Sequence, residues 1–227
     1  MKKVFLFLAM GVLLFAGCKP RETEVNPDSV FGQHYDAFDF QIWFALNDSD
    51  EAYTDLISMM NVDSNVNVLG YGLQVQPTDA DAVMTKALNA VMDYADIDTS
   101  HAYMPVWQVN CDSTLLLFFT YGIGAPDTEL PVLVGSEVEK AKTYYDKSGV
   151  EVAMLFNKEA ADRWAQITAD NLGRNVVIML GEDREGRVLS APRIMGEITG
   201  GRCSVSGLTV DEAKALTMIL NNNNTIQ

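Results

Sequence analysis

The alternation of hydrophobic and polar positions is clearest in the C-terminal half of the chain. Four short stretches there are either apolar throughout or alternate apolar with polar residues, which is typical of half-buried or fully buried strands. The predicted strands are 150–156, 176–180, 187–191 and 202–206. The polar turn 181–186 makes the second and third strands a predicted hairpin, and Pro192 ends it.

Helical spacing of apolar residues predicts two helices among these strands. The first follows Asn157, a favoured N-cap residue, and ends at Gly173. The second follows a capping box of Thr209 and Glu212 and runs to about Leu220. The predicted inward stripes are Ala161, Trp164, Ala165, Thr168 and Leu172 on the first helix, and Val210, Ala213, Leu216, Thr217 and Leu220 on the second. A capping box over 136–139 predicts a further short helix over 136–145.

The first half of the chain is also predicted to mix helices and strands. Strands are expected at 38–46, 66–76, 106–109 and 113–121, the last two as a hairpin, and helices at 50–60 and from Thr78, as N-cap, to about Tyr94. The fold class is therefore α+β. A ferredoxin-like unit is one arrangement that fits this first region.

The N-terminus has the pattern of a secretory signal. Two lysines precede an apolar run from Val4 to Ala16, which is shorter than the about 20 residues of a transmembrane helix. The following Ala-Gly-Cys18 resembles a bacterial lipobox, so we predict lipid attachment at Cys18; an ordinary signal peptide is the alternative. Lys19 favours the outer membrane, facing the periplasm or the cell surface, if the enterobacterial sorting rule applies.

The predicted organisation follows from these elements. It comprises a signal peptide (1–17), a polar tether (18–30), an α+β region of unknown family (31–126), a second α+β domain (127–220) and a polar tail (221–227). The formal net charge of −15 argues against nucleic acid as a partner, because the phosphate backbone would be repelled.

Candidate chemistry is sparse. If Cys18 carries lipid, Cys111 and Cys203 remain, and they either pair in an oxidising compartment or stay buried thiols. The two histidines, His34 and His101, are not part of any Cys-x-x-Cys or His-Glu-x-x-His motif, so no metal or cofactor is predicted. Motifs for nucleophilic catalysis or phosphate binding are also missing, and we predict that the protein is not an enzyme.

The order of segments in the C-terminal part resembles SecD, the membrane subunit that assists bacterial preprotein translocation. The most specific signal is Leu189-Ser-Ala-Pro192 followed by Ile198-Thr-Gly-Gly201. The other matching segments are 131–135, 152–173, 205–207 and 209–216. The resemblance is to the head subdomain of the first large periplasmic domain of SecD.

This resemblance implies a head that contacts unfolded, translocating polypeptide without a catalytic residue. The residues it points to are Ser190, Ala191, Pro192, Ile194, Thr199, Gly200 and Gly201, and Met195 is added as part of an apolar groove beside Ile194. By residue type alone, the glycines and the proline are more typical of turns and bulges than of ligand contacts. We therefore predict an envelope lipoprotein that binds unfolded or extended polypeptide, in protein export or envelope quality control, by strand addition or in an apolar groove near Ile194. The alternative is a structural lipoprotein that docks onto a fixed envelope protein.

Overall fold

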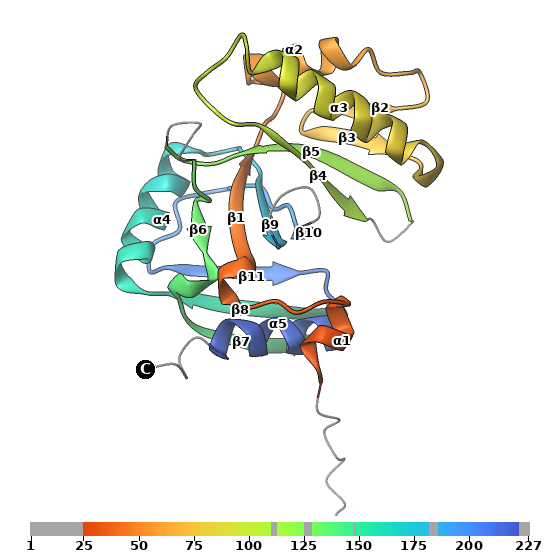
Figure 1. The fold of residues 1–227 in the computed structure, drawn as a ribbon. Helices are drawn as coiled ribbons and strands as arrows, with labels where there is room; N and C mark the ends of the chain where they lie inside the picture. The colour runs from red at the N-terminus through yellow and green to blue at the C-terminus, as the bar shows by residue number, and fades with distance from the viewer. Residues whose placement is uncertain (1–24, 110–112, 125–128, 148, 182–185, 223–227) are drawn as a thin grey trace, which may run out of the picture.

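The computed structural model describes residues 25–109, 113–124, 129–147, 149–181 and 186–222 (Figure 1). The predicted signal peptide, Cys18 and most of the polar tail lie outside the described residues. Within these ranges, no helix is both long enough and apolar enough to cross a bilayer.

Helices and strands are mixed along the chain, which confirms the predicted α+β class. The helices are α1 (Pro27–Phe31), α2 (Glu51–Met60), α3 (Ala80–Tyr94), α4 (Lys158–Asp170) and α5 (Val210–Asn222), with 3-10 turns at Ala37–Asp39, Pro77–Asp79 and Gly135–Glu137. The strands are β1 (Phe40–Ala45), β2 (Asn67–Leu69), β3 (Gly72–Val75), β4 (Met104–Val109), β5 (Leu115–Tyr121), β6 (Leu133–Val134), β7 (Val138–Asp146), β8 (Gly149–Phe156), β9 (Val176–Leu180), β10 (Arg187–Ser190) and β11 (Arg202–Ser206).

The larger sheet has the strand order β10-β9-β1-β5-β3-β2, with β4 also on β5 and β6 on β1. All its pairs are antiparallel. A ferredoxin-like unit also has only antiparallel neighbours, and this arrangement stays a prediction for the first region. Helices α2 and α3 cover β3 and β5, where Leu56, Leu73 and Leu117 are fully buried.

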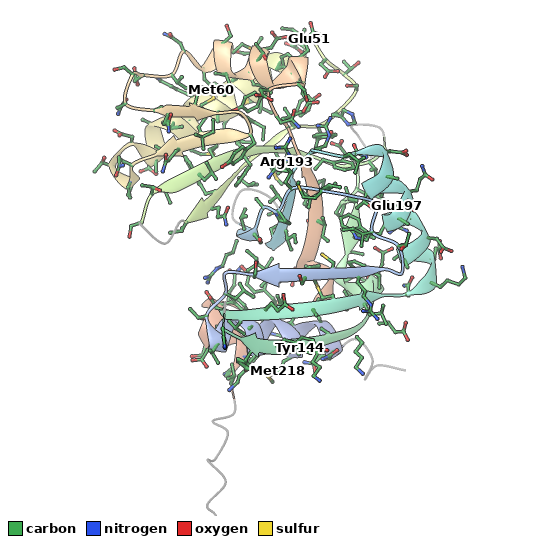
Figure 2. The ribbon with its side chains drawn as sticks, turned by 180° about the vertical axis from the view of Figure 1, so that it is seen from behind. Glu51, Met60, Tyr144, Arg193, Glu197 and Met218 are labelled. Atoms are coloured by element: carbon green, nitrogen blue, oxygen red, sulfur yellow. The ribbon has the colours of Figure 1, made fainter. Side chains whose placement is uncertain are left out.

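The smaller sheet has the order β11-β8-β7, and α5 packs on one of its faces. The hydroxyl of Thr143 on β7 lies 2.8 Å from that of Thr217 on α5. The main core fills the space between this sheet, α4, α5 and strands β1 and β9 of the larger sheet. Figure 2 shows the two sheets from behind, with Tyr144 on the smaller sheet and Met60 on the helical layer at the other end of the molecule.

Strand β1 joins the two predicted regions in one sheet. It pairs with β9 over five residues, from Phe40 opposite Leu180 to Phe44 opposite Val176. The Arg174 guanidinium also donates two hydrogen bonds of 2.6 and 2.8 Å to the Asp50 carboxylate across the same seam. The larger sheet therefore contains strands from both sides of the predicted boundary at 126–127.

The segment 136–145, predicted as a helix, is instead the long strand β7. A hydrogen bond from the Val134 backbone N–H to the Glu137 carboxylate begins two residues before the predicted 136–139 box and closes a single 3-10 turn. After that turn, Ala141 is buried while Lys140 and Lys142 are exposed, which is the two-residue period of a strand. Pairing with β8 overrides the local helix signal.

Smaller corrections concern caps and faces. Thr78 does not cap α3, because it lies inside a 3-10 turn that precedes the helix. The expected strand 66–76 is the hairpin of β2 and β3. Leu172 and Val210 are 61% and 45% exposed, so neither belongs to the buried stripe predicted for its helix. The predicted caps at Asn157 and Thr209 are confirmed by side-chain hydrogen bonds of 3.0 and 3.3 Å to backbone N–H groups.

Candidate functional site: a groove at a free strand edge

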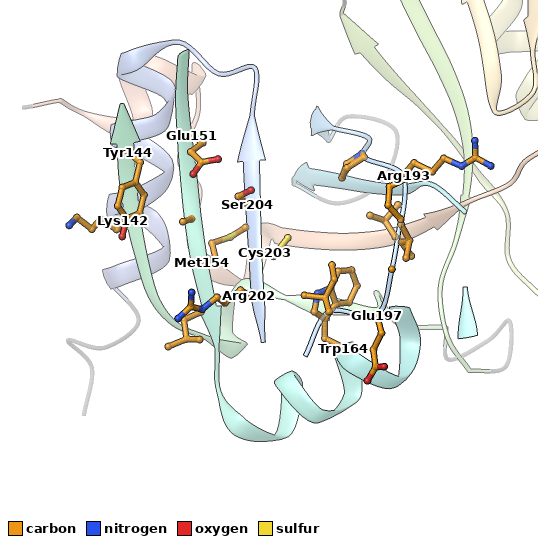
Figure 3. A pocket seen from close by; sticks show the side chains of 18 of the residues that line it. Lys142, Tyr144, Glu151, Met154, Trp164, Arg193, Glu197, Arg202, Cys203 and Ser204 are labelled. Carbon is orange, nitrogen blue, oxygen red and sulfur yellow. The ribbon is translucent and has the colours of Figure 1, made fainter. Parts of the chain in front are cut away.

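A groove of about 970 Å³ lies between the three-stranded sheet and residues 192–198, which we call the wall segment (Figure 3). Strands β7, β8 and β11 supply one side of this groove and the wall segment supplies the other. Trp164, from α4, lies between β11 and Glu197 of the wall segment.

The strand register explains which side chains face the groove. Lys142 is paired with Ala153, and Ala153 is paired with Ser204, so each strand contributes one residue to a row across the sheet. All three line the groove. Their neighbours along the strands, such as Val152 and Val205, are fully buried in the main core. Strand alternation thus gives the small sheet one core face and one open face.

One edge of β11 carries backbone hydrogen-bonding groups that are not paired with another described strand. Among the described strands, β11 pairs with β8 alone. The Phe156 N–H donates to the Gly201 carbonyl at 2.9 Å, which fixes Gly201, Cys203 and Val205 as the residues that bond to β8. The N–H and C=O groups of Arg202, Ser204 and Ser206 therefore point away from β8, along a free edge.

The opposite edge of the same sheet is blocked. The side-chain amide of Asn221, on α5, donates to the Ala141 carbonyl at 3.0 Å and accepts from the Ala141 N–H at 2.9 Å. This pair of bonds imitates a neighbouring strand at the middle of β7. The edge that can accept another strand is therefore the β11 edge.

The groove combines apolar surface with positive charge. Met195, Tyr144 and Leu155 line it and are 84%, 47% and 36% exposed. Its lining carries four basic and two acidic residues, whereas the whole chain carries a net charge of −15. An apolar surface left open beside a free strand edge is the feature that extended polypeptides recognise.

Three of the predicted binding residues line the groove: Pro192, Ile194 and Met195. Their exposures differ, because Ile194 is 4% exposed and belongs to the main core. Its backbone N–H donates to the Arg174 carbonyl and its carbonyl accepts from the Gly173 N–H. Met195, in contrast, is an exposed wall residue that a ligand can reach without disturbing the core.

The other predicted binding residues have structural positions. Ser190 ends β10 opposite Ile178, and the Ala191 carbonyl accepts a hydrogen bond from the Asn175 side chain. Thr199, Gly200 and Gly201 form the turn into β11, where both glycines have positive φ. A Cβ on Gly201 would lie 2.4 Å from the Ala161 Cβ, so this glycine permits the turn to pack against α4.

Sequence reasoning missed the residues of β7 and β8 that line the groove, among them Lys142, Tyr144 and Leu155. The misassigned helix over 136–145 hid the β7 residues. The signal that could have found them is the alternation of Lys140, Lys142 and Tyr144 with Ala141 and Thr143, in a segment rich in residues that favour strands.

Cys203 lines the groove and forms no disulfide with another described residue. Burial raises the pKa of its thiol to about 12, so the nucleophilic thiolate is scarce at neutral pH. Its predicted disulfide partner, Cys111, lies outside the described residues, and the pairing stays a prediction.

The two histidines have carboxylate neighbours. His34 Nδ1 lies 3.0 Å from Asp28 Oδ1, and His101 Nδ1 lies 2.7 Å from Glu129 Oε1. No group of three or more His, Cys, Asp or Glu residues that could hold a metal ion is found in the part of the chain that the structure describes.

Comparison with known proteins places the groove in a recognised domain. Residues 127–224 match the family model described as SecDF, P1 head subdomain. The chain is 38% identical to the protein translocase subunit SecD of Acidaminococcus fermentans over 91 aligned residues. The alignment covers 39% of this chain and 21% of that protein. It is 34% identical over 92 residues to SecDF of Thermus thermophilus, covering 40% of this chain and 12% of that protein.

Solved structures align with this chain at low TM-scores. One, described as a membrane component SecDF that enhances protein export, aligns over 80% of this chain and 92% of that chain, at 19% identity and a TM-score of 0.37. A crystal structure of SecDF in a super-membrane-facing form aligns over 74% of this chain and 32% of that chain, at 16% identity and a TM-score of 0.36. The C-terminal part of this chain, residues 127–224, is a SecD P1 head-like domain.

Proposed function

We propose that this protein binds unfolded or extended polypeptide, as an added strand on the free edge of β11. The observation that carries the proposal is the outward row of backbone groups at Arg202, Ser204 and Ser206 beside an open groove. Main-chain hydrogen bonds of this kind give affinity for any extended segment, because every residue except proline supplies the same donor and acceptor.

The setting of this activity is proposed from the relatives and from the N-terminal sequence. The relatives are named as protein translocase subunits, which supports a role in protein export or envelope quality control. Lipid on Cys18 would hold the domain at a membrane surface, in the outer membrane if the sorting rule applies, facing the periplasm or the cell surface. Neither role requires a catalytic residue.

The alternative, docking onto a fixed envelope protein, has its own structural support. The same free edge and the exposed Met195 would serve one folded partner equally well. The two functions differ in whether the occupant must be unfolded, and a binding experiment separates them.

The test is a titration of the chain from Lys19 onward, which keeps every described residue, against a fluorescein-labelled secretory protein. The labelled protein is used reduced and carboxamidomethylated, hence permanently unfolded, and in its native form. We expect a saturable rise in anisotropy with the unfolded form alone. Met195→Asp should weaken binding about tenfold, because it places a carboxylate in the apolar part of the groove.

Met92→Asp is the matched control, because Met92 is 71% exposed on α3 and lies outside the groove. We expect it to bind like the original chain. Equal losses in both variants would point to a non-specific charge effect. Lack of saturable binding to the unfolded form at high micromolar concentration would overturn the proposal in favour of the docking alternative.

A further inference from the structure

Trp164 is buried beside the groove with an unused hydrogen-bond donor. Its side chain is only 2% exposed, yet its Nε1–H has no hydrogen-bond partner among the described residues. Buried indole N–H groups are normally paired, because an unpaired buried donor has given up its bonds to water. Trp164 also lines the groove, where a ligand could supply the missing acceptor.

The indole is held rigidly in this position. Its ring meets Phe156 of β8 edge to face, with centroids 6.3 Å apart. The Trp164 carbonyl accepts a hydrogen bond from the Thr168 hydroxyl, which in turn accepts one from the Ile198 N–H of the wall segment. The ring contact thus links the indole to β8, and the Thr168 hydroxyl links the turn of α4 that carries Trp164 to the wall segment.

A strand added to β11 would carry the acceptor that Trp164 lacks. In an extended segment, alternate residues direct their carbonyls to opposite sides. The carbonyls on one side of the added strand would bond to Arg202 and Ser204 on β11, and those on the other side would face the wall segment. Figure 3 shows Trp164 on that side, between β11 and Glu197. The Glu197 carboxylate nearby favours a neutral amide carbonyl over a second carboxylate.

We infer that the Trp164 indole N–H donates a hydrogen bond to a main-chain carbonyl of the bound polypeptide and thereby sets its position along β11. This inference rests on the proposed function and names a specificity-determining residue for it. Because the contact is to the main chain, it selects extended backbone and tolerates different side chains.

The test is NMR of the chain from Lys19 onward with ¹⁵N-labelled tryptophan, titrated with the unlabelled unfolded polypeptide described above. The chain has three tryptophans, so three indole signals are expected. We expect the Trp164 signal to move downfield on binding. Trp43 is an internal reference, because its indole already donates to Gln41 at 2.9 Å, and Trp107 on β4 is a second.

A paired substitution measures the same contact as affinity. Trp164→Phe keeps an aromatic ring without the donor, and we expect about tenfold weaker binding. Trp107→Phe is the matched control and should bind as the original chain does. If the Trp164 variant fails to fold, the indole shift in the unaltered chain still decides the question.

The two proposals fail in different ways. Saturable binding that leaves the Trp164 indole signal unmoved would overturn the role of Trp164 and leave polypeptide binding intact. An absence of any binding would overturn the proposed function itself. A shift of all three indole signals would show a global change of the fold, and would also contradict a specific contact at Trp164.

Discussion

Replacement of Ile178 by alanine is expected to lower the free energy of unfolding by about 2–5 kcal/mol. Ile178 is fully buried in the main core at the centre of β9, opposite Ile42 on β1. The smaller side chain removes apolar contact and leaves a cavity between the two sheets. Because β9 belongs to the head-like domain and β1 to the first region, both should unfold in one transition.

Urea denaturation followed by far-ultraviolet circular dichroism and by tryptophan fluorescence measures this effect. Tryptophans lie in both regions, at Trp43 and Trp164, so the two signals should coincide in the original chain and in the variant. Ile97→Ala is the matched control, because Ile97 is 66% exposed, and it should change stability by less than about 0.5 kcal/mol. Two separate transitions would contradict the shared sheet.

Replacement of Ser204 by proline is expected to weaken binding of unfolded polypeptide by at least about tenfold. The Ser204 N–H points away from β8, so proline removes a donor that β11 would offer to the ligand and leaves the β8–β11 pairing in place. The ring also obstructs the approach of an added strand. The effect should therefore appear in affinity more than in stability.

Ser204→Ala is the matched control, because it removes the hydroxyl and keeps the backbone N–H. We expect its affinity to equal that of the original chain, and both variants should keep the original circular dichroism spectrum. An alanine variant as weak as the proline variant would show that the side chain, not the strand edge, binds the polypeptide. A proline variant with full affinity would exclude strand addition at this position.

Local patterns in the sequence predicted most of the elements. Strands β8 and β9 were evident from apolar runs, and α4 and α5 from their caps at Asn157 and Thr209. The capping signal at 136–139 predicted a helix over 136–145. Most of this segment is instead strand β7, which pairs with β8. Strand pairing is a tertiary effect that helix-capping signals cannot anticipate.

The site was only partly predictable for the same reason. The resemblance directed attention to Pro192 and Ile194, which do line the groove. The free edge of β11 and the blocked edge at Ala141 depend on which strands are neighbours, and α5 supplies Asn221 from 80 residues further along the chain. The unpaired donor of Trp164 is likewise visible only once the packing around it is known.

The most direct test of strand addition is the exchange of individual backbone amides, measured by NMR with and without the unfolded polypeptide. At saturation, exchange should slow at Arg202, Ser204 and Ser206, whose N–H groups point away from β8, while that of Cys203 and Val205, already bonded to β8, stays slow. Saturable binding with unchanged exchange at all three outward amides would contradict the account.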